Sequence, residues 1–400
     1  MAPLRIGMLL DQDFPPDSRV ENEAVSLIEA GFEVFLFSLA YKKGAGQEVW
    51  NGIKVKRYAA NKWIYKSSAV AYDFPFFHKK VKSMIADFIS KNDIQALHVH
   101  DMVLARAAFR ANKVFGLPLT LDLHENRPVI MQFYPHLKKF PGKYLINLSR
   151  WEKAQNQLLR EADRVVLVTE EARDEAVRSA GIDPGKVVVV PNTIHPDIFL
   201  SYPIEEQIVD RFKDTFNIVY VGDTGLRRGT MELIEALPIV LETVKNARLI
   251  LVGKSSEDLQ LMQRAEELGI SRHVSFEGWQ DVSLFPSYIS VASVCVSPIH
   301  RNLHHDTTFA NKIFQYMAMG KPLVVSDCPP QVRVVQEAQC GLVHEGGSAA
   351  DLARQIIGIS EDPSQAARMG ENGKKAVLDK YNWPKTSARL IDYYQSLANE

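Results

Sequence analysis

The segment Thr307-Thr-Phe-Ala-Asn311-Lys312-Ile-Phe-Gln315-Tyr-Met-Ala-Met-Gly320-Lys-Pro322 predicts a short helix over residues 308–319. A threonine hydroxyl can cap its start, and Gly-Lys-Pro is a typical helix stop. One stripe of this helix is apolar and is expected to be buried: Ile313, Phe314, Met317 and Ala318. Lys312 and Gln315 share the other side, where they either face water or hold a phosphate and a neighbouring hydroxyl pair at the helix start.

Short apolar runs, predicted to be strands, alternate with helical patterns along the whole chain. The predicted strands are 5–10, 34–38, 96–99, 119–123, 165–168 and 187–190 in the first half, and 217–221, 248–252, 274–276, 293–296, 323–325 and 341–343 in the second. These runs are apolar throughout, as in parallel strands that are buried on both faces. The pattern predicts an α/β chain with two doubly wound, Rossmann-like domains, and a composition break places their boundary near residue 203.

Length and composition limit the possible classes of protein. A chain of 400 residues suggests about two domains, and 46% apolar and 24% charged residues are typical of a globular protein. A net charge of −1 argues against a nucleic-acid binder. The sequence shows no signal-peptide pattern and no apolar run of membrane-spanning length, so we expect a cytoplasmic protein. The three cysteines, Cys295, Cys328 and Cys340, are expected to be reduced interior thiols.

In parallel sheets of this kind, ligands bind beyond the carboxyl ends of the strands. Polar residues follow the predicted strands at Asp11, Asp101, His124, Thr169 and Asn192, and then at Asp223, Lys254, Glu277, His300 and Asp327. Neither a dinucleotide fingerprint nor a P-loop is present. His300, His304 and His305 lie beside Asp306, but their spacing is not that of regular metal ligands, and we expect no metal site.

Several separated motifs resemble those of the family 4 glycosyltransferases, retaining enzymes of the GT-B fold. The resemblance is to the branch with an Asp-x-Arg first loop and an Asp-Ser-His-Glu motif. The motifs are Phe14-Pro-Pro-Asp17-Ser-Arg19-Val-Glu-Asn-Glu23-Ala, Asp122-Leu-His124-Glu125, Val190-Pro191-Asn192-Thr193, Tyr220-Val-Gly222…Arg228-Gly229, and Asn311-Lys312-Ile-Phe-Gln315-Tyr-Met-Ala-Met-Gly-Lys-Pro322. The resemblance covers almost the whole chain.

The resemblance implies transfer of a sugar from a UDP- or GDP-linked donor to an acceptor hydroxyl, with retention and without a cofactor. It implies two Rossmann-like domains that face a central cleft. Residues 1–202, joined by a C-terminal helix over about 382–400, would form the acceptor-side domain, and 203–381 the donor-binding domain. The acceptor is expected to be a glycan or a lipid-linked molecule, in the synthesis of a surface polysaccharide or glycoconjugate.

The roles of single residues follow from the charge that develops on a departing diphosphate. His124, Arg228 and Lys312 are the catalytic candidates. Arg228 could equally be a solvated loop residue, and His124 a histidine satisfied by strand-end carbonyls. The donor nucleotide is expected at Gly222, Asp223, Gly278, Thr307, Thr308, Asn311 and Gln315. The acceptor-side candidates are Asp17, Arg19, Glu125 and Asn126, although Arg19 could instead pair with Glu23 one helical turn away.

The chain departs from the family pattern at two donor positions. Family members often carry two acidic residues eight apart, where this chain has Thr307 and Gln315, and many carry an arginine after the first glycine, where it has Asp223. The pyrophosphate is therefore expected to depend more on Arg228, Lys312 and Arg301. An epimerase of the same fold and a non-catalytic sugar-nucleotide binder remain as alternatives.

A basic and aromatic segment over residues 54–82 contains a single acid, Asp73. Its basic residues are Lys54, Lys56, Arg57, Lys62, Lys66, Lys79, Lys80 and Lys82, and its aromatic residues are Tyr58, Trp63, Tyr65, Tyr72, Phe74, Phe76 and Phe77. This composition suits peripheral contact with a membrane or with an anionic lipid-linked acceptor. The alternative is a loop and helix that pack their aromatic residues onto the first domain.

Overall fold

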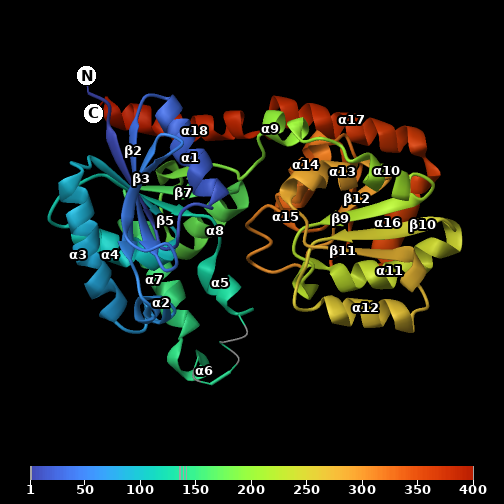
Figure 1. Cartoon of the computed structure of the whole chain (residues 1–400), viewed down its shortest axis with the longest axis horizontal. Coiled ribbons are helices and arrows are strands. Elements are labelled where there is room, and N and C mark those ends of the chain that lie inside the picture. Colours follow the sequence, from blue (N-terminus) through green and yellow to red (C-terminus); the bar gives the residue numbers. More distant parts are fainter. Residues whose placement is uncertain (1, 135–136, 138, 141, 400) are drawn as a thin grey trace. The chain divides into compact units, whose positions relative to one another are not determined.

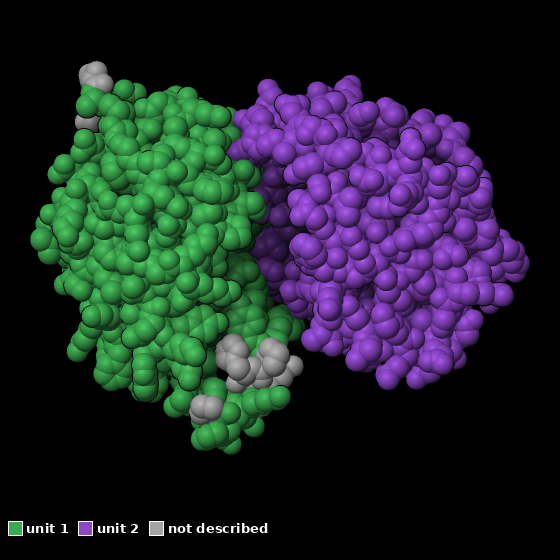
Figure 2. Space-filling model, in the orientation of Figure 1, with its two compact units in different colours: residues 1–191, 387–400 green, residues 192–386 purple. Residues whose placement is uncertain are grey.

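The computed structural model describes residues 2–134, 137, 139–140 and 142–399. The chain divides into two compact units, coloured separately in Figure 2: unit 1 is Met1–Pro191 with Ser387–Glu400, and unit 2 is Asn192–Thr386. The sequence placed these divisions near 203 and 382. Each unit is a parallel sheet with helices on both faces (Figure 1), which confirms the predicted α/β class.

Unit 1 contains, over its described residues, an 8-stranded sheet in the order β3-β4-β2-β1-β5-β6-β7-β8. The strands are β1 Arg5–Leu10, β2 Glu33–Ala40, β3 Gly46–Trp50, β4 Ile53–Ala59, β5 Ala96–His100, β6 Leu119–Leu123, β7 Arg164–Leu167 and β8 Val187–Val189. The helices are α1 Ser18–Glu29, α2 Lys62–Ser68, α3 Phe76–Lys91, α4 Met102–Asn112, α5 Arg127–Met131, α6 Gly142–Leu145, α7 Leu148–Glu161 and α8 Glu170–Ala180.

Unit 2 contains a 6-stranded sheet in the order β11-β10-β9-β12-β13-β14, again over the described residues. The strands are β9 Phe216–Val221, β10 Ala247–Val252, β11 Val274–Gly278, β12 Val294–Ser297, β13 Leu323–Ser326 and β14 Gly341–His344. The helices are α9 Pro196–Ser201, α10 Glu206–Phe212, α11 Thr230–Thr243, α12 Asp258–Glu267, α13 Phe285–Ser290, α14 Lys312–Ala318, α15 Pro329–Ala338, α16 Ala349–Glu361 and α17 Pro363–Asp379. The last helix, α18 Trp383–Ala398, begins in unit 2 and ends in unit 1.

The apolar strand runs are buried on both faces, as predicted. In β9, Val219 and Val221 belong to a core cluster with α13 and α14, whereas Ile218 and Tyr220 belong to a second cluster with α11 and α16. Successive side chains of a strand point to opposite faces, so a strand covered on both sides must be apolar at every position. The three cysteines are buried and free, as expected.

The antiparallel pair β3–β4 at the edge of the unit 1 sheet was not predicted from the sequence. Within the segment read as a basic surface, β4 pairs with β2 on one side and with β3 on the other. Lys54 pairs with Glu33, Arg57 with Glu48, and Lys56 lies 3.9 Å from Asp87. In β4 the buried Ile53 and Val55 alternate with the basic Lys54 and Lys56 because one face of this part of the sheet is solvated, and that alternation hid the strand. Within the described ranges, no helix is both long and apolar enough to cross a membrane.

Candidate functional site

Lys312 is the first residue of α14, and its ammonium group is buried at the carboxyl end of β9. The Nζ atom lies 3.3 Å from the centroid of the Tyr220 ring and makes no hydrogen bond to any described residue. A Cβ atom on Gly222, where φ is +111°, would lie 3.5 Å from this Nζ, so the Gly222 loop lies directly against the Lys312 amine. Burial, with the nearby Arg228 charge, holds the pKa of Lys312 well below its ordinary value.

Arg228 lies close enough to Lys312 for the two charges to repel each other. It ends a short 3-10 turn, Leu226–Arg228, where its Nε lies 3.7 Å from an Asp223 carboxylate oxygen and its Nη1 lies 3.5 Å from His305 Nε2. Asp223 also pairs with Arg227, at 3.2 Å. The structure therefore brings Gly222, Asp223, Arg228 and Lys312 together. Arg227 and Arg228 share the exposed Asp223 carboxylate, and Lys312 has no ion pair of its own among the described residues, so basic groups are in excess at this edge of unit 2.

The start of α14 corrects the predicted helix. The helix begins at Lys312 rather than at residue 308, and Asn311 occupies the N-cap position without a side-chain cap bond. The Thr307 hydroxyl donates instead to the carbonyls of Leu303, at 2.7 Å, and His304, at 3.3 Å, and the Thr308 hydroxyl donates to His304 at 2.8 Å, so neither caps the helix. The predicted stripe of Ile313, Phe314, Met317 and Ala318 is buried, and Gly320 ends the helix with φ +65°. The helix is only 7 residues long, so its dipole is weak.

Other predicted donor residues lie around the same edge. Gly278 ends β11 with φ +68°, and the next residue, Trp279, is 72% exposed. Gln315 is half-buried in α14, and Asn311 is exposed. Arg301, in contrast, forms ion pairs with Asp306 at 2.7 Å and with Asp327 at 3.4 Å, so it is held within its own loop.

In unit 1, the side chain of His124 lies at the carboxyl end of β6 between two carboxylates. Its Nε2 lies 2.9 Å from Asp122, its Nδ1 lies 3.8 Å from Asp101, and its backbone N–H donates to Asp101 at 3.3 Å. Burial opposes a charge on this imidazole, but the Asp122 and Asp101 carboxylates outweigh it and raise the pKa of His124 to about 10. His124 is therefore an imidazolium at neutral pH rather than a base.

Asp101 adopts a strained backbone conformation directly after β5. Its φ of +57° and ψ of 177° fall in a region that is used almost only by glycine, at a cost of about 1–3 kcal/mol. The strained residue is the one whose carboxylate faces His124. The strain is consistent with an Asp101 carboxylate that is held in place for His124. The sequence offered no sign of this role of Asp101 beyond its position after a strand.

The remaining unit 1 candidates have mainly local partners. Asp17 caps α1 by accepting from the N–H of Val20, and Asn126 caps α5 by accepting from the N–H of Val129. Glu125 pairs with Arg127 at 3.3 Å, and burial, with the nearby Asp101, raises the pKa of Glu125. The remaining candidate, Arg19, is buried and pairs with Glu23, which was the alternative left open by the sequence.

Two histidine clusters differ in their potential to bind metal. Within the described part of the chain, the only group of His, Cys, Asp and Glu with ligand-like spacing is Glu23, His98, His100 and Asp122, and the loop of His300, His304 and His305 forms none. The four residues of this group are fully buried under the unit 1 edge and were not singled out together by sequence reasoning. The signal was present as polar residues inside two buried strands, at positions 98, 100 and 122.

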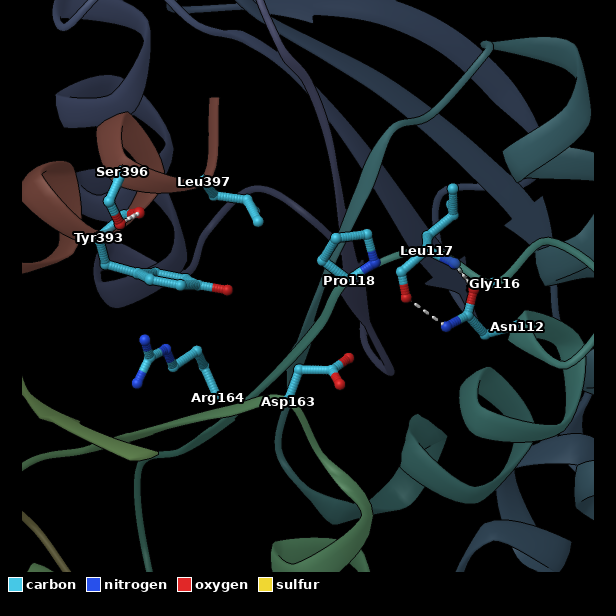
Figure 3. Close-up of a pocket in the computed structure, with 9 residues that line it drawn as sticks. All are labelled: Asn112, Gly116, Leu117, Pro118, Asp163, Arg164, Tyr393, Ser396 and Leu397. Carbon is cyan, nitrogen blue, oxygen red and sulfur yellow. Dashed lines mark hydrogen bonds between the residues drawn. The ribbon is translucent and has the colours of Figure 1, made fainter. Parts of the chain in front are cut away.

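A pocket lies at the opposite edge of the unit 1 sheet (Figure 3). It is lined by Pro118 before β6, by Asp163 and Arg164 at the start of β7, and by Tyr393, Ser396 and Leu397 of α18. These are the amino ends of the strands, whereas His124 and Asp101 follow the carboxyl ends. The pocket is therefore separate from the candidate site.

Comparison with known proteins agrees with this geometry. The family profile described as "Glycosyltransferase Family 4" matches residues 18–198, and the one described as "Glycosyl transferases group 1" matches 202–376. A phosphatidyl-myo-inositol mannosyltransferase of Mycobacterium leprae is 24% identical over 84% of this chain and 81% of its own. The chain belongs to the family 4 glycosyltransferases.

Solved structures show the same fold. Sucrose-phosphate synthase of Thermosynechococcus elongatus superposes with a TM-score of 0.76 at 17% identity, over 99% of both chains. HepE of Anabaena in complex with UDP superposes with a TM-score of 0.72 at 15% identity, over 98% of this chain and 100% of its own. The fold is therefore GT-B, which confirms the expectation drawn from the sequence motifs.

Proposed function

We propose that this glycosyltransferase moves a sugar from a UDP- or GDP-linked donor to an acceptor hydroxyl with retention of anomeric configuration. The observation that carries the proposal is the buried Lys312 ammonium, which lies beside Arg228 and has no hydrogen-bond acceptor among the described residues. Burying a cation without an acceptor is costly unless a ligand supplies the anion. A diphosphate above Gly222 would satisfy both cations.

In the proposed reaction the bond from the anomeric carbon to the diphosphate oxygen breaks as a bond from that carbon to the acceptor oxygen forms. The acceptor hydroxyl loses its proton to the departing phosphate oxygen, which leaves the nucleoside diphosphate. Lys312 and Arg228 stabilise the charge on the leaving group, and the energy they contribute is realised mainly in the transition state. We also assign His124 of unit 1 a role in transfer, as its sequence motif and its positive charge suggest.

We further propose that these cations replace a divalent metal in the reaction. The donor-side group contains three basic side chains, Arg227, Arg228 and Lys312, and one carboxylate, Asp223, rather than the several oxygen ligands that Mg²⁺ or Mn²⁺ prefers. Turnover should therefore persist in EDTA.

The names of relatives support the kind of substrates: the Mycobacterium leprae relative is a phosphatidyl-myo-inositol mannosyltransferase, and the HepE structure contains UDP. We propose a glycan or lipid-linked acceptor in surface polysaccharide or glycoconjugate synthesis.

A thermal-shift screen of the wild-type protein tests donor binding. UDP, GDP and their glucose and mannose conjugates are expected to raise the melting temperature, and a ligand at 100 times its Kd would stabilise the protein by about 2.7 kcal/mol. One base should be preferred over the other. A variant with Arg228 replaced by methionine should lose most of the shift, whereas Arg248→Met, which removes an arginine bonded to Ser275, should keep it. The absence of a shift with all of these ligands would contradict the proposal. If incubation with a nucleotide sugar and no acceptor produced an epimer of that sugar, the protein would be an epimerase instead.

We also propose that unit 1 contacts an anionic membrane through the α2–α6 surface, defined as residues 62–80, 139–140 and 142–150. Its exposed aromatic residues are Trp63, Tyr65, Phe74, Phe76, Phe140 and Tyr144, between 40% and 84% exposed. Asp73 is the single acid of these two segments. Its carboxylate accepts hydrogen bonds from the Asn147 N–H at 3.2 Å and from Trp151 Nε1–H at 3.3 Å, and these bonds place the two segments side by side. Aromatic rings with lysines around them are suited to anionic lipid headgroups.

Co-sedimentation with vesicles tests this contact. Wild-type protein is expected to bind vesicles of phosphatidylcholine with phosphatidylglycerol and to bind phosphatidylcholine alone weakly, because the lysines require anionic lipid. Replacing Trp63 and Phe76 by serine should weaken binding by about tenfold or more. The matched control replaces Val114 and Leu259, also exposed at 78% and 73% but outside the surface, and should bind as wild type does. Equal binding to both kinds of vesicle, or equal loss in both variants, would contradict the proposal.

A further inference from the structure

One face of two neighbouring unit 1 strands is polar although it is fully buried. In the parallel register of β5 and β6, His98 lies opposite Thr120 and His100 opposite Asp122, and all four side chains are 0–1% exposed. Their strand neighbours Leu97, Val99, Leu119 and Leu121 point to the other face, into the apolar core. Buried polar groups need partners, so this face must be completed by groups from other elements.

Helix α1 supplies a first set of partners. Glu23 lies 3.3 Å from His98 Nε2 and pairs with Arg19, whose guanidinium lies 3.9 Å from the other carboxylate, Asp122. Asp122 in turn lies 3.3 Å from both His98 Nε2 and His100 Nδ1. The same Asp122 oxygen lies 2.9 Å from His124 Nε2. A continuous path of polar contacts therefore runs from the buried His98 to the half-exposed His124.

Helix α18 closes the other end of this path. The Tyr394 hydroxyl lies 2.9 Å from His98 Nδ1, and the ring is fully buried. The neighbouring hydroxyl of Tyr393 lies 2.9 Å from Thr120 Oγ1, which also accepts a longer hydrogen bond from the Tyr394 hydroxyl at 3.5 Å. Two adjacent tyrosines of one helix thus bring similar hydroxyls to the same sheet, and the Tyr394 hydroxyl is the one that lies against His98 Nδ1.

We infer that Tyr394 and His98 are positioning residues for His124, acting through a buried hydrogen-bond chain Tyr394–His98–Asp122–His124 that is complete only with the C-terminal helix in place. The inference rests on the proposed role of His124 in transfer. In this chain both ring nitrogens of His98 donate: Nδ1–H to the Tyr394 oxygen, and Nε2–H to the carboxylates. An imidazolium at His98 fixes the orientation of Asp122, which holds the ring of His124.

The charges around the chain support this arrangement. Burial would lower the pKa of His98, but hydrogen bonds to Asp122 and Glu23 outweigh it and raise the pKa to about 9. His100 has a lowered pKa, because burial dominates there, and it stays neutral. Charged and titratable groups of four elements face His98 and His124. They are Arg19 and Glu23 of α1, His100 of β5 with Asp101 directly after it, Asp122 of β6 with Glu125 after it, and Tyr394 of α18.

A bound metal is the competing explanation of the same cluster. Ligand atoms of Glu23, His98, His100 and Asp122 all lie within 4.8 Å of one another. However, Arg19 already pairs with one of the two carboxylates and lies near the other, and a charged His98 adds a second cation. Two carboxylates are thus balanced without an ion, and we favour the hydrogen-bond chain.

NMR of protein labelled with ¹⁵N at its histidines tests the chain directly, because imidazole nitrogen shifts report protonation. His98 is expected to be charged at pH 7.5 in the wild type. In Tyr394→Phe the buried Nδ1–H loses its acceptor, and the titration midpoint of His98 should fall by about one pH unit or more. Tyr393→Phe removes the adjacent hydroxyl and should leave the midpoint unchanged. A neutral His98 in the wild type, or equal shifts in the two variants, would overturn the inference.

A second variant reports on the coupling to His124. In His98→Gln the amide still donates to the carboxylates but carries no charge, so the His124 midpoint should rise by about half a unit or more, together with the alkaline limb of kcat. An unmoved His124 midpoint, or one equivalent of Zn²⁺ or Mn²⁺ retained by the wild type and lost in this variant, would overturn the chain. If the His98 and His124 midpoints move as expected but the wild type transfers sugar from none of the donors, the proposed reaction is refuted and the hydrogen-bond chain is not. If the wild type is active but these midpoints do not move in the variants, the hydrogen-bond chain is refuted and the proposed reaction is not.

Discussion

Replacing Lys312 by methionine is expected to lower kcat for sugar transfer by about 10²- to 10³-fold, the usual loss when one preorganised donor to a developing oxyanion is removed. Methionine is similar in length, so it should keep the packing over the Tyr220 ring that the ammonium now makes at 3.3 Å. The loss should appear in kcat more than in KM, because the departing diphosphate gains charge in the transition state.

Donor binding should also be linked to proton uptake through Lys312. Burial, and then the Arg228 charge, lowers the pKa of Lys312 in the free protein. A diphosphate beside the ammonium stabilises the charged form and raises the pKa again, so protons are taken up on binding. Calorimetry in two buffers of different ionisation enthalpy measures this uptake. It should be present in the wild type and absent in Lys312→Met.

Lys321→Met is the matched control for these measurements. Lys321 is also largely buried at the other end of the same segment, but its Nζ donates to the Ser290 carbonyl at 2.7 Å and so has a partner within the fold. Its removal should cost stability and leave proton uptake and kcat near the wild-type values. A Lys312→Met enzyme within about twofold of wild-type kcat would exclude Lys312 from the mechanism.

The fold was predictable wherever burial on both faces left a continuous apolar run. The predicted strands 5–10 and 119–123 match β1 and β6 to the residue, and the others are within three residues at each end. The sequence failed at the edge strand β3, which has no buried residue, and at its neighbour β4, where Lys54 and Lys56 alternate with the buried Ile53 and Val55. Strands near the edge of a sheet carry charged residues on a solvated face, so their residue pattern resembles that of a surface loop.

The sequence motifs named Gly222, Arg228 and Lys312 as donor-side candidates, and these residues lie close together in unit 2, while their role in donor binding stays a prediction. Their local bonding was not predictable from the sequence. The capping role given to the threonines was wrong, because the loop that precedes α14 turns back and presents the His304 carbonyl to both hydroxyls. The turn contains an ion pair between Arg301 and Asp306 and has no signature in the helix sequence itself.

The charge on His124 could not be predicted from its neighbours in sequence. It depends on Asp101, which is 23 residues away in the chain, and on Asp122, whose other partners come from α1 and the sheet. Tyr394 is 296 residues from His98. The pKa of a buried group is set by all charges that surround it in space, so a motif can name the histidine without giving its protonation state.

Replacing Gly229 by alanine is expected to destabilise unit 2 by about 3 kcal/mol or more, which corresponds to a loss of about 6 °C or more in melting temperature. Gly229 has φ +74° and directly follows Arg228. An added Cβ would lie 1.8 Å from the backbone carbonyl oxygen of Pro298, so the backbone of one of the two segments must move. That movement displaces the Arg228 turn, and the thermal shift caused by the preferred nucleotide should be lost as well.

Gly269→Ala separates the close contact from the backbone conformation alone. Gly269 has a similar φ of +68° in the same unit, but an added Cβ there meets nothing within 4 Å. Only the left-handed conformation penalises the alanine, at about 1 kcal/mol or about 2–4 °C, and nucleotide binding should be unchanged. Differential scanning calorimetry with and without nucleotide measures both effects. If the two variants lost equal stability, the contact with Pro298 would not be what requires glycine at 229, and the Arg228 turn would not depend on it.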